Sequence, residues 1–195
     1  MVAQIESNRL QKVYREEVVP KLREEFKIAN IHAMPRLSKV VVNCGVGKYL
    51  ENQKLRQDIR DTVLSTLTTI SGQRPIEVLA KRSVAHFKVR EGAPSAFMVT
   101  MRGQRMWSFM DRLINLAIPR IKDFRGVKAK SFDKAGTYSL GLTEQAVWPE
   151  INMANVTFTH GMHINVVFEN STPEMSRFVL QELGMPFVRA ESTDS

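Results

Sequence analysis

The sequence has one cysteine among its 195 residues, Cys44, and it lacks long apolar runs. A single thiol cannot form a disulfide within the chain or supply a zinc site built from several thiolates. The apolar runs fall far short of the roughly 20 residues that a helix needs to cross a bilayer. The first residues have no apolar run behind basic side chains, and Glu6, Glu16 and Glu17 are untypical of a transit peptide. These absences predict a soluble protein of a reducing compartment, the cytoplasm.

Motifs for catalysis and for cofactor binding are also missing. The run Gly45-Val46-Gly47-Lys48 follows a predicted strand, but Tyr49 stands where a phosphate-binding loop needs Ser or Thr. Cys44 falls on the apolar side of that strand, where a buried thiol has a raised pKa and is inert. His160 and His163 are three residues apart around a predicted turn, which is not a typical spacing of metal ligands. We therefore expect no enzymatic activity, no cofactor and no bound metal.

Positive charge is in excess and is unevenly distributed. The chain has 28 Lys and Arg residues against 20 Asp and Glu, a formal net charge of +8 at pH 7. Residues 74–130 contain 13 of these cations and only 4 of the acids, so this segment alone carries +9. A segment so strongly of one sign favours a polyanionic partner. Its cations are scattered among Gly, Pro and short strand-like runs rather than along one amphipathic helix, which favours nucleic acid over a membrane surface.

Hydrophobic periodicity predicts helices and strands in irregular alternation. Apolar residues at every third or fourth position indicate helices, whereas alternation of apolar and polar residues indicates strands. The expected helices cover residues 8–27, bent at Pro20, 55–70, ending at Gly72, 106–118, ended by Pro119, and 173–184. The expected strands cover residues 37–44, 76–79, 97–102, 156–159 and 163–168, of which the last two are expected to form a hairpin.

This order of elements indicates an α+β fold with a mainly antiparallel sheet, helices packed on one face and projecting basic loops. The stretches 80–94 and 120–147 contain Gly and have little periodicity, so we expect long loops or irregular hairpins there. No linker divides the chain. We therefore expect a single RNA-binding domain over residues 1–195, with flexible tails at residues 1–7 and 190–195.

Both predicted loops are rich in cations. The first carries Lys81, Arg82, Lys88 and Arg90. Cations on a flexible arm suit a phosphate backbone, which is recognised by charge more than by geometry. The second carries Arg120, Lys122 and Arg125 around Phe124. An aromatic ring between cations can stack on a base, but it can equally anchor its loop to the core, and both interpretations stay open.

The alternation within the predicted strands separates two faces of the sheet. Val40, Val42, Phe97 and Val99 fall on the apolar face. The opposite face presents Val41, Asn43, Met98, Thr100, Arg102, His163, Asn165 and Val167. Its amides and hydroxyls suit base edges and 2′-hydroxyls of an unstacked RNA region. An ordinary solvent-exposed face is the alternative, so the residue pattern predicts a basic nucleic-acid binder and goes no further.

Six short strings in register along most of the chain resemble one protein family. They are NCGVG (43–47), ISGQRP (70–75), AKRSVA (80–85), RGQRMW (102–107), PRIKDFRG (119–126) and KSFD (130–133). Each string alone is a weak signal, but their order and spacing match from about Leu10 to Phe187. On these strings the chain resembles bacterial large ribosomal subunit protein five, the 5S-rRNA-binding ribosomal protein family.

The resemblance implies a non-catalytic constituent of the large ribosomal subunit, with an antiparallel sheet and helices on one side. It implies that the exposed sheet face binds 5S rRNA, and it makes 23S rRNA a further partner. The residues assigned to 5S rRNA are Asn43, Gln73, Thr100, Arg74 and Arg102. Asn43 and Thr100 are also on the face that alternation predicts to be polar, so the two lines of reasoning agree there.

The same resemblance gives each basic loop a partner. The arm with Lys81, Arg82, Lys88 and Arg90 would reach peptidyl-site tRNA. The loop with Arg120, Lys122, Phe124 and Arg125 would face the small-subunit head, near small-subunit protein thirteen at the intersubunit bridge. The chain departs from the family pattern at Cys44, Val78 and His86. An RNA-processing enzyme or a general RNA-binding module that uses the same basic surface is the alternative.

Overall fold

The computed structural model describes residues 8–87, 89–156 and 158–188, so the predicted tails, residues 1–7 and 190–195, lie outside the described residues. The chain divides into two compact units. Unit 1 comprises residues 1–39, 102–140 and 166–195, and unit 2 comprises residues 40–101 and 141–165. None of the described helices is long and apolar enough to cross a membrane.

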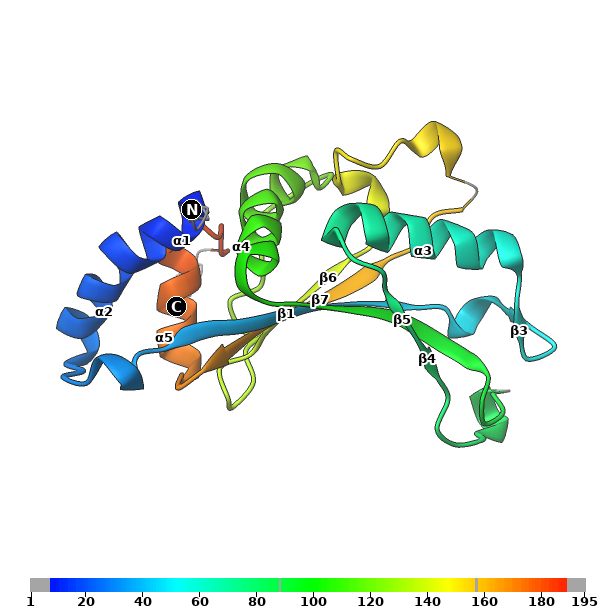
Figure 1. Cartoon of the computed structure of the whole chain (residues 1–195), viewed down its shortest axis with the longest axis horizontal. Coiled ribbons are helices and arrows are strands. Elements are labelled where there is room, and N and C mark those ends of the chain that lie inside the picture. The colour runs from blue at the N-terminus through cyan, green and yellow to red at the C-terminus, as the bar shows by residue number, and fades with distance from the viewer. Residues whose placement is uncertain (1–7, 88, 157, 189–195) are drawn as a thin grey trace, which may run out of the picture. The chain divides into compact units, whose positions relative to one another are not determined.

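Five strands form the main sheet in the order β4-β5-β1-β7-β6 (Figure 1). Their bounds are β1 (Arg36–Gly45), β4 (Ile76–Leu79), β5 (Pro94–Met101), β6 (Tyr138–Leu142) and β7 (Met162–Glu169). Strands β1 and β4 both pair antiparallel with β5, and a separate hairpin joins β2 (Leu50–Glu51) to β3 (Lys54–Leu55). This sheet and its helices confirm the predicted α+β fold. Strands β1, β6 and β7 contribute residues to both units, so the single RNA-binding domain stays a prediction.

The two long helical segments of unit 1 each contain a π-helical turn. The first consists of α1 (Arg9–Val13), the π-helical turn Tyr14–Val18 and α2 (Val19–Phe26). The second consists of α4 (Gly103–Arg112) and the π-helical turn Leu113–Ala117. Each π-helical turn ends two residues before a proline, Pro20 or Pro119, whose ring would clash with a carbonyl of a regular α-helical turn. The wider turn relieves that clash, which explains why the first helix continues past Pro20.

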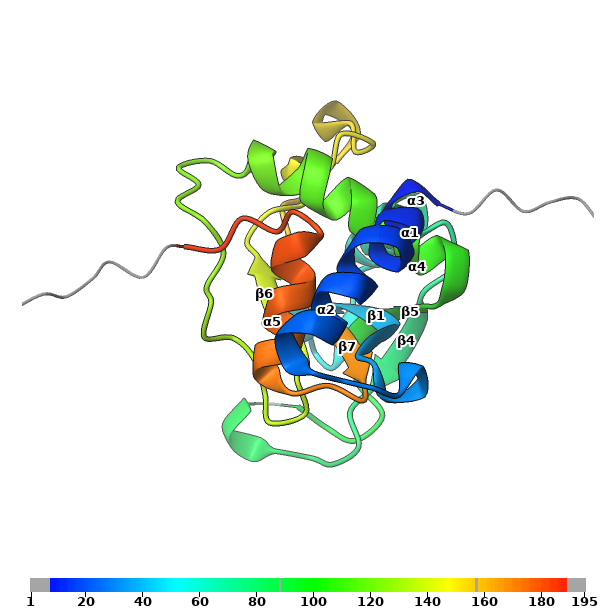
Figure 2. The same ribbon diagram turned by 90° about the vertical axis from the view of Figure 1, so that its left-hand side faces the viewer.

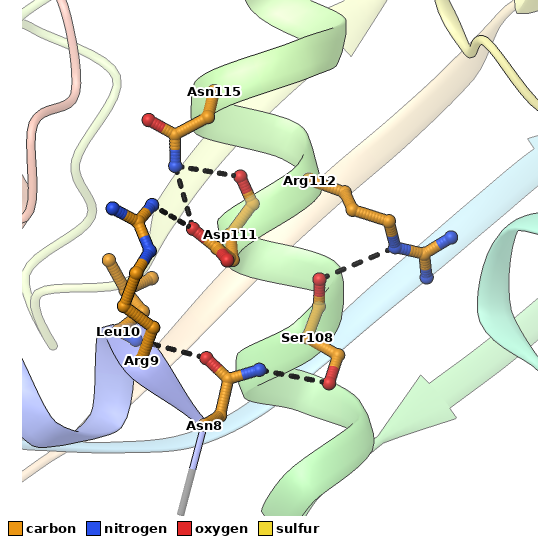
Figure 3. A network of polar contacts seen from close by, with 7 residues as sticks. All are labelled: Asn8, Arg9, Leu10, Ser108, Asp111, Arg112 and Asn115. Carbon is orange, nitrogen blue, oxygen red and sulfur yellow. Dashed lines mark hydrogen bonds and ion pairs between the residues drawn. The ribbon is translucent and has the colours of Figure 1, made fainter.

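Polar contacts fix α1 on α4 within unit 1 (Figure 3). Asn8 accepts a hydrogen bond from the backbone N–H of Leu10 (3.0 Å), which caps α1, and its side-chain amide donates to the Ser108 hydroxyl (3.0 Å). Arg9 and Asp111 form an ion pair of 2.7 Å beside them. Figure 2 shows the neighbouring pair, in which α2 packs against α5 (Pro173–Glu182). The helices of unit 1 are therefore joined in two packed pairs.

In unit 2, one face of the sheet is buried against α3 (Gln57–Ser71), as Figure 1 shows. The inward positions of two paired strands, Val42, Cys44, Phe97 and Val99, are at most 1% exposed. Helix α3 ends at Gly72, whose φ of +67° is a left-handed conformation that glycine adopts without strain. The helix predicted over 55–70 and its end at Gly72 are confirmed, although it starts at Gln57 because Leu55 belongs to β3. The alternation of the strand over 37–44 is confirmed as well. The other face of this part of the sheet carries no described α-helix.

The predicted hairpin of residues 156–159 and 163–168 is wrong. Strand β7 has β1 and β6 as its neighbours, and the described part of 156–159 forms no strand. The side chain of Gln145, which is fully buried, accepts a hydrogen bond from the His160 N–H (2.7 Å) and donates one to the Phe158 carbonyl (2.9 Å). Backbone groups expected to take part in the hairpin are therefore satisfied by a side chain. Strand β6 lies in the stretch expected to be a loop.

Candidate nucleic-acid interface

The face of unit 2 opposite α3, which we call the open face, carries two polar residues that the sequence singled out. Asn43 and Thr100 are diagonal neighbours on paired strands, because Val41 lies opposite Thr100 and Asn43 lies opposite Met98. Both are half-buried, and neither side chain has a hydrogen-bond partner in the part of the chain that the structure describes. The strands therefore position one amide and one hydroxyl whose donors and acceptors are free.

Gln73 joins the open face from the turn between α3 and β4. Its side-chain Nε2 donates a hydrogen bond to the backbone carbonyl of Thr100 at 2.8 Å. The Ser71 hydroxyl accepts a hydrogen bond from the Gln73 N–H at 3.3 Å and donates one to the Gln73 carbonyl at 2.9 Å, which fixes the turn. The structure thus brings together the three neutral residues assigned to 5S rRNA, Asn43, Gln73 and Thr100.

The two arginines assigned to the same RNA are placed differently. Arg74 is exposed and borders a shallow hollow along α3 together with Thr68 and Thr69. Arg102 is exposed and directly follows β5, but it belongs to unit 1. Both assignments stay predictions.

Apolar and basic side chains complete the open face. Ile76 of β4 lies opposite Met98 and is 57% exposed. On β7, His163 is exposed and Asn165 is half-buried, while Ile164 between them is fully buried on the other side of the strand. Sequence reasoning missed Ile76, because the residue pattern of a four-residue strand does not reveal its register with β5. The face can therefore contact both polar and apolar parts of a nucleotide.

The basic arm, residues 80–93, projects from the end of β4 and returns to β5 (Figure 1). A backbone hydrogen bond from the Ala80 N–H to the Ala93 carbonyl (2.8 Å) closes its base, and the N–H of Arg90 donates to the Gln53 side chain (2.8 Å). Three described cations of the arm are exposed and form no ion pair with any described residue: Lys81, Arg82 and Arg90. The fourth, Lys88, lies outside the described residues. The arm thus presents unneutralised positive charge to solvent.

The second basic loop belongs to unit 1. Its cations Arg120, Lys122 and Arg125 are exposed, and Phe124 is half-buried with no ring neighbour among the described residues. Gly126, with a φ of +107°, approaches the C-terminal segment so closely that a Cβ there would lie 2.8 Å from the Val188 nitrogen. The end of the loop is therefore held in place. Stacking and anchoring both stay open for Phe124.

The candidate nucleophile and metal ligand lie in the interior of unit 2. Cys44 is fully buried and His160 is 2% exposed, and the Cys44 Sγ lies 3.2 Å from the His160 Nδ1. Burial raises the pKa of the Cys44 thiol to about 12 and lowers the pKa of His160. The predicted burial of the thiol is confirmed. No group of three or more His, Cys, Asp or Glu side chains within the described ranges could hold a metal ion.

Comparison with known proteins identifies the family. The family model for ribosomal protein L5 matches residues 30–90, and the model for the C-terminus of the same ribosomal protein family matches residues 94–187. Large ribosomal subunit protein uL5 of Synechocystis sp. is 46% identical over 181 residues, which are 93% of this chain and 98% of that protein. The uL5 proteins of Picosynechococcus sp. (46%) and Microcystis aeruginosa (45%) match 93% of this chain and 98% and 99% of their own lengths. With both family models and these relatives in agreement over nearly its whole length, the chain belongs to the uL5 family of large-subunit ribosomal proteins.

Proposed function

We propose that this chain binds 5S rRNA through the open face as a non-catalytic constituent of the large ribosomal subunit. Members of its family are structural proteins of the cytoplasmic ribosome rather than enzymes, and rRNA is their partner. The excess of positive charge, +8 at pH 7, agrees with an RNA partner. The more specific assignment to 5S rRNA depends on the open face.

The observation that carries the proposal is the pair Asn43 and Thr100. They are diagonal neighbours on a face without a described α-helix, and the hydrogen-bonding groups of their side chains have no partner among the described residues. Neutral donors and acceptors on a sheet suit base edges and 2′-hydroxyls, which phosphate-directed cations cannot distinguish. The Gln73 side chain, held on the Thr100 carbonyl at 2.8 Å, adds a third positioned amide.

The basic loops extend this proposal to other partners. Lys81, Arg82 and Arg90 of the arm, together with Lys88, contact peptidyl-site tRNA. Arg120, Lys122, Phe124 and Arg125 face the small-subunit head near small-subunit protein thirteen, and other basic surfaces contact 23S rRNA. The exposure of the arm cations and their lack of ion pairs within the described chain support the first assignment. Such cations gain affinity by releasing counterions from the RNA backbone.

A competition experiment tests the assignment to 5S rRNA. We expect the chain to retain labelled bacterial 5S rRNA in a gel shift at a stated salt concentration when a structured RNA of equal length competes at about tenfold excess. Equal competition would instead indicate a general RNA-binding module. Incubation of the same RNA with the protein and magnesium should leave it intact, because cleavage would indicate an RNA-processing enzyme.

Replacing Lys81 and Arg82 with alanine separates the arm from the open face. We expect 5S rRNA affinity to change less than about twofold, while the salt slope of tRNA binding falls by about one for each phosphate that the arm no longer reaches. Binding measured at several salt concentrations checks both. The matched control replaces Lys12 and Arg23, exposed cations on helices of unit 1. Equal weakening of binding to both RNAs would mean that the two surfaces are exchanged.

A further inference from the structure

A cleft of about 540 Å³ lies in unit 2 beside the arm. Phe87 and Val89 line it on the side of the arm, and Gly47, Lys48 and Tyr49 line it on the side of the turn that follows β1. His163, near the start of β7, also lines the cleft, and its side chain is exposed on the open face. These segments are far apart in the sequence, so only the fold creates the cleft. Its volume is in the range of small-ligand sites.

Two aromatic rings border this cleft. Phe87 is 73% exposed, the highest value among the exposed large hydrophobic residues of the described chain. The His86 ring lies 5.4 Å from the Phe87 ring in an edge-on arrangement. The Tyr49 ring is similarly braced by Phe158, with ring centres 5.1 Å apart. The Tyr49 ring is thus half-buried against Phe158, whereas the Phe87 ring stays exposed, so both can offer a face to a flat ligand.

The charge and backbone of the cleft favour an anionic, planar ligand. None of the ten residues that line it is acidic, and Lys48 is exposed at its edge. Gly45 and Gly47 expose their backbone to the cleft, because a Cβ at either position would have no atom within 4 Å. Glycine at such a wall lets a ligand approach the main chain closely.

The cleft also continues the open face. His163 lines the cleft, and Asn165 lies two residues further along β7 on the same side of the strand, since the buried Ile164 separates them. Strand β7 is the neighbour of β1, which carries Asn43. An RNA that lies across the open face can therefore direct one nucleotide into the cleft without leaving the protein surface.

We propose that the cleft binds one unpaired nucleotide of the RNA on the open face, with its base stacked on Phe87 and Tyr49 and its phosphate near Lys48. This inference rests on the proposed function, because it assumes that RNA occupies the open face. Aromatic stacking accepts any base, so the cleft provides affinity for an unstacked nucleotide rather than recognition of one sequence. Lys48 supplies a single charge to the phosphate.

Titration of the full ¹⁵N-labelled chain with adenosine 5′-monophosphate tests the cleft directly. We expect the nucleotide to shift the backbone amide resonances of residues 45–49 and 161–163, with ribose 5-phosphate and inorganic phosphate producing no comparable shifts. Phe87→Ala should weaken nucleotide binding by about 5- to 150-fold, the range for removal of one base–aromatic stack. Phe87→Trp should restore it. Val84→Ala, at an exposed position of the same arm outside the cleft lining, is the matched control.

The outcomes separate this inference from the proposed function. Equal shifts with inorganic phosphate, or equal nucleotide affinity in Phe87→Ala, would overturn the nucleotide cleft. With 5S rRNA, Phe87→Ala should lower affinity about fivefold or more at an unchanged salt slope, because a neutral ring releases no counterions. If the unmodified chain shows no preference for 5S rRNA but still binds adenosine 5′-monophosphate, the proposed function fails and the cleft stands. If 5S rRNA is preferred and Phe87→Ala binds it equally well, only the cleft fails.

Discussion

Combining Asn43→Ala with Thr100→Val should weaken 5S rRNA binding by about 5- to 150-fold, which corresponds to roughly 1–3 kcal/mol for the removal of two hydrogen bonds. Both side chains lie on the open face with no hydrogen-bond partner among the described residues, so an RNA group that pairs with them loses its partner in the variant. Valine keeps the β-branched shape of threonine in the strand. The slope of log affinity against log salt should not change, because neither residue releases counterions.

Filter binding at three salt concentrations measures both quantities. The matched control replaces Thr68 and Thr69 with alanine, because these threonines are exposed on α3, on the opposite side of the sheet. Thermal unfolding of each variant should stay close to that of the unmodified chain, since both open-face positions are half-buried. Unchanged 5S rRNA affinity, or a salt slope that falls together with the affinity, would contradict the division between neutral and cationic contacts.

The native chain should react with iodoacetamide at pH 8 at least about a thousandfold more slowly than free N-acetylcysteine. Burial raises the pKa of Cys44 from an ordinary value of 9.0 to about 12, which lowers the thiolate fraction at pH 8 by about that factor. The side chain is also fully buried, so the reagent must wait for an opening of the structure. Mass spectrometry of the alkylated protein over time gives the rate.

Two comparisons make the thiol measurement decisive. In concentrated urea the same cysteine should react at the rate of the free thiol, because unfolding removes the burial that raises its pKa. The variant Ser65→Cys, with a second thiol at an exposed position of α3, should incorporate one label quickly and the other slowly. A native Cys44 that reacts as fast as the exposed thiol would show that the interior of unit 2 opens readily.

Local sequence patterns predicted those elements whose stability depends on their own residues. Helix α3 has a regular apolar stripe, and Gly72 adopts the left-handed conformation that ends it. Alternation in β1 correctly separated Asn43 from the buried Val42 and Cys44. The hairpin before β7 was predicted from local residues alone. It does not form because a distant buried side chain, Gln145, holds the His160 N–H and the Phe158 carbonyl.

In the candidate site, too, local patterns predicted which face a residue lies on but not its contacts with residues distant in the sequence. Periodicity placed Asn43 and Thr100 on one face, but the proposed RNA and the role of Gln73 came from the family resemblance. The contact of Gln73 with the Thr100 carbonyl and the position of Ile76 opposite Met98 depend on strand register. The cleft depends on four separated segments, near residues 45–49, 87–89, 142 and 161–163. The periodicity of a single segment cannot predict that these four segments meet in the fold.

The position of β7 between β1 and β6 has a consequence for the order in which the nascent chain can assemble. During synthesis, β1, β4 and β5 can pair early, because their residues end at Met101. Until residues 162–169 emerge as β7, the edge of β1 stays unpaired and β6 has no neighbouring strand. Unpaired strand edges can pair with other chains, so aggregation is most favoured during this interval. A chaperone that covers the edge of β1 would have its largest effect at this stage.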